Sequence, residues 1–278
     1  MRIDIHAYVG HWPFRQLRGN SCEGLLAKMN EFGIDKAVIS NINGIFYKNT
    51  QPANEELYQA VKPYRDRFIP FAIINPTYAD WKYDLDVCCN DFEMKGLRLY
   101  PQYHDYEITN PACIDLVKAA RDYDIPVAFS LRLTDLRQRS WLDVQKVRFD
   151  EKIYDEQLTL DDIATVVSEV PDAKYIVLHA RPCVYEKEES INILKKAEIV
   201  FDTVRGSGVP VTGPNGYSIV QTLQKYGKEK VAFGTAAPFM DYCSPFIRIE
   251  VMKADEADEE IKQLLWSGNA LRILGMRD

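Results

Sequence analysis

Short runs of β-branched and other apolar residues alternate along this chain with longer segments whose apolar residues recur at the spacing of an amphipathic helix. The short runs predict strands at 2–7, 36–41, 68–75, 95–100, 126–131, 174–179, 198–203 and 230–235. The longer segments predict helices at 22–33, 53–64, 79–92, 188–197, 217–226 and 257–274, the last in one or two pieces, with further helix starts at Asn110-Pro111 and Thr159-Leu-Asp-Asp162. This alternation is typical of βαβ units, and eight parallel strands close a (β/α)8 barrel.

The length of the chain fits a single barrel of this kind. At 278 residues it is close to the typical length of about 250, and neither a repeat nor a linker divides it, so we expect one domain over 1–278. One connection is unusually long: a charged loop insertion at about 132–158 separates the fifth strand from the next helix. Because this loop follows a strand, we expect it to lie over the barrel mouth, where the strands end and the active sites of such folds are found.

Composition narrows the class of partner. The chain carries 34 Lys and Arg against 41 Asp and Glu, and the resulting net charge of −7 argues against a nucleic acid or an anionic membrane as partner. It contains neither a run of roughly 18 apolar residues nor a signal-peptide pattern, and its six cysteines form no C-x-x-C pair. We therefore predict a cytoplasmic protein with buried thiols and a small-molecule partner. Self-association into a homo-oligomer stays open.

Several predicted strands end in side chains that can do chemistry. Because successive side chains of a strand point to opposite faces, Asp4, His6 and Tyr8 are expected to share the face that opens into the barrel mouth. The same spacing pairs Arg98 with Tyr100, Ser130 with Arg132, and His179 with Arg181. Guanidinium groups hold carboxylates and phosphates in a bidentate geometry, so we predict a small anionic ligand. The alternative is that these arginines only form ion pairs with nearby acids such as Asp4 and Asp202.

Segments that carry a family resemblance run through the whole chain. In order they are Ile3-Asp-Ile-His-Ala-Tyr8, Phe32-Gly-Ile-Asp-Lys-Ala-Val38, Phe68-Ile-Pro-Phe-Ala-Ile-Ile-Asn-Pro76, Lys95-Gly-Leu-Arg-Leu-Tyr-Pro101, Ile125-Pro-Val-Ala-Phe-Ser130, Tyr175-Ile-Val-Leu-His179, Phe233-Gly-Thr-Ala-Ala-Pro238 and Gly268-Asn-Ala-Leu-Arg272. Together they resemble the amidohydrolase-related family of metal-dependent TIM-barrel hydrolases and decarboxylases. The resemblance implies a (β/α)8 barrel of the amidohydrolase type.

The resemblance also implies a metal centre, built from two histidines of the first strand, one histidine each from the fifth and sixth strands, and an aspartate of the eighth. In this chain two of those positions hold His6 and His179, and the other three hold Tyr8, Ser130 and Ala236. Catalytic zinc normally has three protein ligands, so we expect zinc or another divalent metal to be held weakly by His6 and His179 or to be absent. The missing aspartate would also take the proton from an attacking water, which argues against ordinary hydrolysis.

Two functions are compatible with these residues. The first is an amidohydrolase-family hydrolase or lyase that acts on a small anionic organic substrate, with an altered or absent metal site and with His6 and His179 as the catalytic residues. The residues expected to contact its substrate are Tyr8, Arg98, Tyr100, His104, Ser130, Arg132 and Arg181. The second is a non-catalytic barrel that serves as a small-ligand binding or regulatory module. Retention of His6 and His179 favours the enzyme. A rebuilt metal site that recruits His11 or His104 from the loops is a further alternative.

Overall fold

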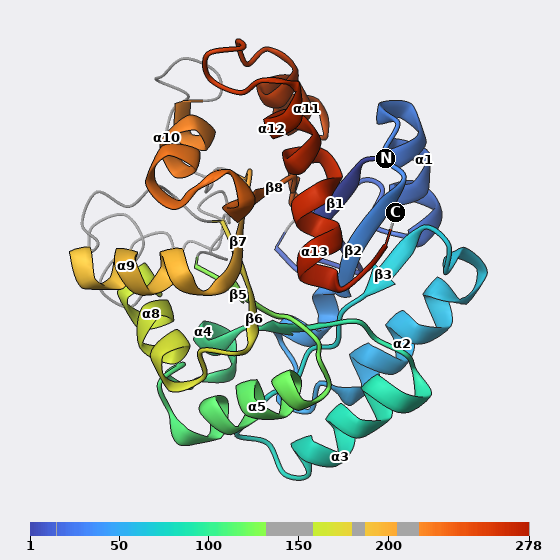
Figure 1. Ribbon diagram of the computed structural model, residues 1–278. Helices are drawn as coiled ribbons and strands as arrows, with labels where there is room; N and C mark the ends of the chain where they lie inside the picture. The colour runs from blue at the N-terminus through green and yellow to red at the C-terminus, as the bar shows by residue number, and fades with distance from the viewer. Residues whose placement is uncertain (15, 132–157, 180–186, 205–216, 278) are drawn as a thin grey trace.

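The computed structural model describes residues 1–14, 16–131, 158–179, 187–204 and 217–277 (Figure 1). Eight strands form within these ranges: β1 (Ile3–Val9), β2 (Lys36–Asn41), β3 (Phe68–Pro70), β4 (Leu97–Leu99), β5 (Val127–Ser130), β6 (Lys174–Leu178), β7 (Glu198–Asp202) and β8 (Val231–Ala232). Each lies where the apolar runs predict a strand. The strands β3 and β8 are much shorter than predicted, because beyond them the pairing continues only as isolated bridges at Ala72 and Ala237.

The strands are all parallel and close into a ring. Hydrogen-bonded pairing runs in chain order through β1, β2 and β3, and separately through β4 to β8. Two parallel bridges join these groups, Ala72 with Leu97 between β3 and β4 and Ala7 with Ala237 between β8 and β1. The backbone N–H of Ile5 also donates to the carbonyl of Phe233 at 2.9 Å across the second seam. The (β/α)8 prediction is confirmed.

Helices surround the strands (Figure 1). In the described ranges they are α1 (Cys22–Phe32), α2 (Gln51–Val61), α3 (Trp81–Asp86), α4 (Pro101–His104), α5 (Pro111–Asp122), α8 (Leu160–Glu169), α9 (Glu188–Lys196), α10 (Tyr217–Tyr226), α11 (Cys243–Glu250), α12 (Glu259–Gln263) and α13 (Asn269–Leu274). The predicted caps are confirmed: the Asn110 side chain accepts from the N–H of Ala112, and Thr159 and Asp162 form a capping box. No helix in the described ranges combines the length and the apolar character needed to cross a bilayer.

Several helices differ from the sequence-based prediction. The helix expected over 79–92 is α3 followed by a π-helical turn at Val87–Asp91, and the one expected over 257–274 is α12, a second π-helical turn at Leu264–Gly268, and α13. The patterns did not predict α4 or α11. In α11, Pro245 looks like a helix breaker, but it lies in the first turn, where the missing N–H costs nothing.

The barrel interior is apolar at the end where the strands begin. Val38, Ala128, Ile176 and Val200 belong to one buried cluster, together with residues of α13 such as Ile273. The helix α13 therefore packs against this end of the barrel. A second, larger cluster fills the space between the strands and the surrounding helices. The opposite end of the barrel, where the strands finish, holds the buried polar side chains described next.

Candidate active site

The first strand does not keep a two-residue alternation along its whole length. Its register with β2 shifts between Asp4 and Ala7, which marks a β-bulge. Ile5 packs in the interior cluster, and a Cβ added to the interior Gly234 would lie near both Ile5 and His6. Two consecutive side chains of β1 therefore face the barrel interior. The prediction that Asp4 shares a face with His6 is wrong, because the bulge reverses the alternation.

Asp4 instead ties the ends of β1 and β8 together. Its carboxylate accepts the backbone N–H groups of His6 at 2.9 Å and of Thr235 at 3.1 Å, and the Thr235 hydroxyl at 2.6 Å. The side chain is fully buried. Desolvation raises the pKa of Asp4 to about 6, although the hydrogen bonds from Thr235 and His6 act in the opposite direction. Asp4 is thus a structural carboxyl beside the site.

The central feature of the site is a hydrogen-bonded chain of three buried side chains. Asp202, the last residue of β7, lies 2.5 Å from Nδ1 of His6 through its Oδ2 atom, and Nε2 of His6 lies 2.8 Å from the hydroxyl of Tyr8. Burial lowers the pKa of His6 well below its ordinary value, and the charges of His179 and Arg98 act in the same direction. The lowered pKa favours a neutral ring. Because a carboxylate oxygen can only accept, we assign the proton to Nδ1, which leaves Nε2 to accept from the Tyr8 hydroxyl.

His179 adjoins this chain at the end of β6. Its ring lies edge-on to that of His6, with 4.5 Å between the centroids, and its backbone N–H donates to Oδ2 of Asp202 at 3.1 Å. Unlike His6, His179 is only partly buried. Its φ of 57° lies in the left-handed region, as does that of Ala236 just beyond β8. Such backbone strain in residues other than glycine is concentrated at functional sites.

A glycine brings the chain together. A Cβ at Gly234 would lie 3.0 Å from the Cβ atoms of both Asp202 and His6, a separation that real Cβ contacts rarely reach. Only a residue without a side chain lets these two residues approach each other here. The sequence patterns missed Asp202 as a functional residue and considered it only as an ion-pair partner. The available signal was an acid that directly follows the buried run Ile199–Phe201 at a strand end.

Arg98 is at the site but points away from solvent. It is completely buried, and its guanidinium donates to the carbonyl of Ala7 at 2.9 Å and to the hydroxyl of Ser40 at 3.0 Å. The guanidinium carbon lies 4.7 Å from the centre of the Tyr8 ring. The guanidinium thus stacks on one face of the Tyr8 ring, and its hydrogen bonds go to Ser40 and to the backbone carbonyls of Ala7 and Ile5. Ion pairing with an acid, the alternative for this arginine, is not seen among the described residues.

Two tyrosines flank Arg98. Burial raises the pKa of both Tyr8 and Tyr100, while the charge of Arg98 acts in the opposite direction on each. Both are therefore neutral phenols at neutral pH. The Tyr100 hydroxyl lies 3.2 Å from the hydroxyl of Ser40, which also accepts from Arg98. The neighbouring Ser130 hydroxyl, fully buried at the end of β5, lowers the pKa of Tyr8. The structure thus brings His6, Tyr8, Arg98, Tyr100, Ser130 and His179 together.

Of the remaining predicted residues, His104 adjoins Tyr100, with 6.3 Å between the ring centroids, and the others lie away from this cluster or outside the described ranges. His104, on α4, is buried; its Nε2 lies 3.1 Å from the carbonyl oxygen of Gly44, and burial lowers its pKa. His11 is exposed and lies 3.2 Å from the side-chain nitrogen of Asn20. Arg132, Arg181 and nearly all of the predicted loop at 132–158 fall outside the described residues.

Aromatic side chains cover Tyr8 on the solvent side. The Tyr8 and Phe239 ring centres are 5.3 Å apart, and Trp12 packs on Phe239 at 5.0 Å and on Phe46 at 5.2 Å. These rings come from the segments that follow β8, β1 and β2. Tyr103, from the segment after β4, continues the cluster at 5.5 Å from Phe46. This cover excludes water from the tyrosine and contributes to the desolvation of the hydrogen-bonded chain.

The family's metal centre does not fit the residues present. Among the described residues, no group of three or more His, Cys, Asp or Glu side chains is arranged to hold a metal ion. Both ring nitrogens of His6 already have partners in Asp202 and Tyr8, and Ser130 and Ala236 stand at two positions where the resemblance implies metal ligands. Neither His11 nor His104 completes a ligand cluster among the described residues, so the rebuilt site is not found there.

Comparison with known proteins identifies the fold type. The chain resembles the 2,6-dihydroxybenzoate decarboxylase from Rhizobium, with 14% identity, a TM-score of 0.70, and coverage of 99% of this chain and 98% of the other. It also resembles the 5-carboxyvanillate decarboxylase from Novosphingobium aromaticivorans, solved with manganese and 4-hydroxy-3-methoxy-5-nitrobenzoic acid, with 15% identity, a TM-score of 0.72, and coverage of 99% and 96%. A third similar structure is the dihydroxybenzoic acid decarboxylase from Polaromonas, solved with manganese and 2-nitroresorcinol, with 13% identity, a TM-score of 0.70, and coverage of 99% and 96%.

A comparison with curated protein sequences found no match. A family model described as Amidohydrolase matches residues 3–276, nearly the whole chain. The match agrees with the closed parallel barrel and with the location of the polar cluster where its strands end. The chain belongs to the amidohydrolase family.

Proposed function

We propose that this protein is a lyase that decarboxylates a small aromatic carboxylic acid at the barrel mouth, without the metal centre of its family. The observation that carries the proposal is the buried chain from Asp202 through His6 to Tyr8. Such a chain holds the His6 imidazole in one tautomer and one orientation, and so gives the adjoining His179 ring, the proton donor that we assign below, a fixed support. The similar solved structures are named as decarboxylases of hydroxylated aromatic acids, which supports the substrate class.

Decarboxylation suits these residues better than hydrolysis. Hydrolysis needs a group that takes a proton from water, and Ala236 stands where the family has its carboxylate. Decarboxylation needs the opposite, namely delivery of a proton to the ring carbon that bears the carboxylate. The carbon–carboxylate bond then breaks, its electron pair returns to the ring and restores the aromatic system, and CO2 leaves. One proton is consumed in each turnover and is replaced from water.

We assign the proton delivery to His179, because it is only partly buried, whereas the His6 ring beside it is fully buried. His6 is a positioning residue, fixed by Asp202 and Tyr8, that packs against the His179 ring. The buried charge of Arg98 favours an anionic substrate through the Tyr8 ring. The walls of the site are assigned to Tyr100, Ser130 and His104. Arg132 and Arg181 stay our candidates for direct contact with the substrate carboxylate, by their positions two residues beyond Ser130 and His179.

The test is a substrate screen by chemical class. Hydroxybenzoic acids, including 2,6-dihydroxybenzoate and 5-carboxyvanillate, are incubated with the purified protein, and CO2 release is measured with added chelator and with added Mn²⁺ or Zn²⁺. We expect release that chelator does not reduce. Release that requires the metal would contradict the metal-free mechanism. Hydrolysis of lactones or amides instead would identify a hydrolase, and binding of aromatic acids without any turnover would identify the non-catalytic binding module.

A variant set separates catalysis from folding. The change His179→Gln keeps a polar side chain of similar size and removes the ring, so kcat should fall by about 10²–10⁴-fold, the usual contribution of a positioned proton donor. The matched control is His11→Gln, since His11 is exposed and does not join the cluster. If His179→Gln retained full kcat, His179 would not be the proton donor.

A further inference from the structure

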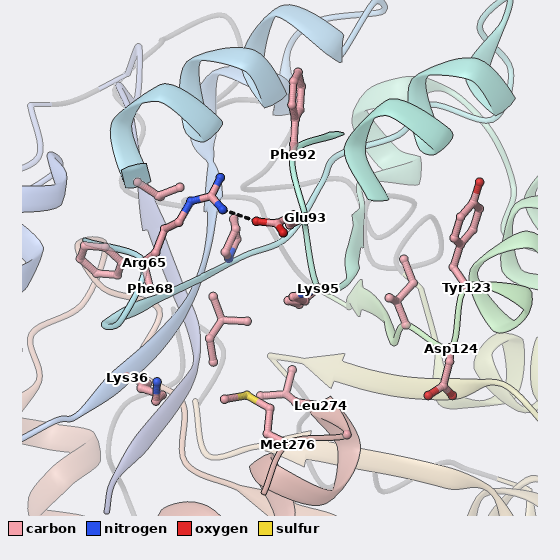
Figure 2. Close-up of a pocket in the computed structure, with 15 residues that line it drawn as sticks. Lys36, Arg65, Phe68, Phe92, Glu93, Lys95, Tyr123, Asp124, Leu274 and Met276 are labelled. Atoms are coloured by element: carbon pink, nitrogen blue, oxygen red, sulfur yellow. Dashed lines mark hydrogen bonds and ion pairs between the residues drawn. The ribbon is translucent and has the colours of Figure 1, made fainter. Parts of the chain in front are cut away.

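A pocket lies at the opposite end of the barrel from the mouth. It has a volume of about 510 Å³ and is lined by residues at or just before the starts of β2, β3, β4 and β5, and by the segment after α13 (Figure 2). Pockets that hold small organic ligands have volumes of about 300–1,000 Å³. In barrels of this type the end at which the strands begin usually contributes stability only, so a pocket of this size there requires an explanation.

Part of the wall of this floor pocket is apolar. Phe68 and Ile125 line it from β3 and from the segment before β5, and Leu274 and Met276 line it from the C-terminal segment (Figure 2). Leu274 and Met276 also pack against the interior cluster of the barrel. An apolar molecule in this pocket would therefore contact side chains that are continuous with the barrel core, and burial of its surface would favour binding.

The charges at the rim of the floor pocket do not balance. Its two acids already have cationic partners: Glu93 is paired with Arg65, as the dashed line in Figure 2 shows, and Asp124 is paired with Lys174 at 2.7 Å. The rim also carries two lysines, Lys36 and Lys95, whose positive charge these acids do not offset. The chain as a whole carries a net charge of −7, so the positive charge beside this pocket is local.

Lys36 and Lys95 supply the excess positive charge at the rim. Neither forms an ion pair with a residue that the structure describes. Lys36, at the start of β2, donates only to the backbone carbonyl of Asp66 at 2.9 Å. Lys95, just before β4, is exposed. Its side chain makes no hydrogen bond with a residue that the structure describes. Both therefore have donors available for an anion.

We propose that the floor pocket binds a small amphipathic carboxylate, with its apolar body against Phe68, Leu274 and Met276 and its carboxylate at Lys95 and Lys36. The ligand would stabilise the folded barrel by mass action, because the pocket exists only when β2, β3 and the C-terminal segment are assembled. This site is independent of the chemistry that we propose for the mouth.

The test uses octanoate as the probe and isothermal titration calorimetry as the measurement. Octanoate should bind, while octanol should bind more weakly and octylammonium should not bind measurably, because the rim is positive. The change Lys95→Met should weaken octanoate binding by about threefold or more, the effect expected for loss of a partly exposed ion pair. Lys36→Met should act in the same direction. The control is Lys118→Met, an exposed lysine of α5 that does not line the pocket.

Each of the following results would overturn the proposal. They are equal affinity for octanol and octanoate, an unchanged octanoate affinity in both Lys95→Met and Lys36→Met, and the absence of octanoate binding. The change His179→Gln should leave octanoate affinity unchanged. If His179→Gln abolished octanoate binding, the probe would be in the mouth, and the floor site would be rejected whether or not the mouth is catalytic. Because the Lys95 side chain makes no hydrogen bond or ion pair with the described residues, and its backbone bond to Pro70 does not depend on the side chain, Lys95→Met is expected to fold normally.

Discussion

The two ends of the barrel handle their polar groups in opposite ways. At the mouth, polar side chains such as Asp202, His6 and Tyr8 are fully buried and satisfy one another through short hydrogen bonds. At the floor, the charged side chains of Lys95 and Glu93 are exposed around an apolar pocket. Buried hydrogen-bonded groups are costly to disturb, whereas exposed ion pairs contribute little. This difference supports our two proposals, chemistry at the mouth and simple binding at the floor.

The largest expected effect comes from removing the carboxylate at the centre of the mouth. In Asp202→Ala the Nδ1–H of His6 and the backbone N–H of His179 lose this acceptor while they stay buried or partly buried. We expect the free energy of unfolding to fall by about 3–5 kcal/mol, as measured by urea denaturation. A loss below about 1 kcal/mol would show that the chain is not preorganised. Octanoate affinity at the floor, measured at a temperature where the variant is folded, should not change.

A pH experiment probes the other buried carboxyl of the mouth end. Desolvation raises the pKa of Asp4 in the folded protein to about 6 from an ordinary 3.8, so ionisation costs the folded state more than the unfolded chain. The stability that Asp4 contributes is fully present below about pH 4 and is lost as the pH rises through about 6. The unfolding free energy of the wild type relative to Asp4→Asn should fall by about 3 kcal/mol over this range. A pH-independent difference would contradict the raised pKa.

The next effect tests the close approach between strands. In Gly234→Ala the new methyl group would lie 3.0 Å from the Cβ atoms of Asp202 and His6 and must push them apart. We expect a loss of about 1–3 kcal/mol in the free energy of unfolding, which is usual for overpacking. The nitrogen chemical shifts of the His6 ring should also change, because the Asp202 bond lengthens. An unchanged His6 spectrum would mean that the strands adjust without breaking the bond.

The smallest effect is expected at the floor. In Glu93→Gln the pair with Arg65 is lost, but the side chains are 42% and 59% exposed, so the free energy of unfolding should change by less than about 1 kcal/mol. Release of Arg65 adds positive charge beside the pocket, so octanoate binding should become slightly tighter. A large loss of stability would contradict the difference between the buried polar groups of the mouth and the exposed ion pairs of the floor. Weaker octanoate binding would count against a positive rim.

The sequence was sufficient to predict most of the fold but only part of the site. Apolar runs such as Ile176–Leu178 are buried on both faces of a parallel strand. The eight strands could therefore be located from these runs in the sequence. The bulge after Asp4 could not be predicted, because it depends on how β1 pairs with β2 and not on β1 itself. Asp202 was missed because its partner, His6, is nearly 200 residues away, and only the closed ring brings them together.

The bulge in β1 also changes how this chain should be compared with its relatives. The extra residue shifts the alternation of inward and outward side chains by one position. The spacing of residues along the sequence therefore no longer tells which of them point inward. Deleting one residue between Asp4 and Ala7 would restore a regular strand and, if the ladder with β2 were kept, leave a single inward side chain where Ile5 and His6 now both face the interior. Equivalent positions in this chain and its relatives are therefore better identified from strand pairing than from the number of residues between the conserved positions of a sequence motif.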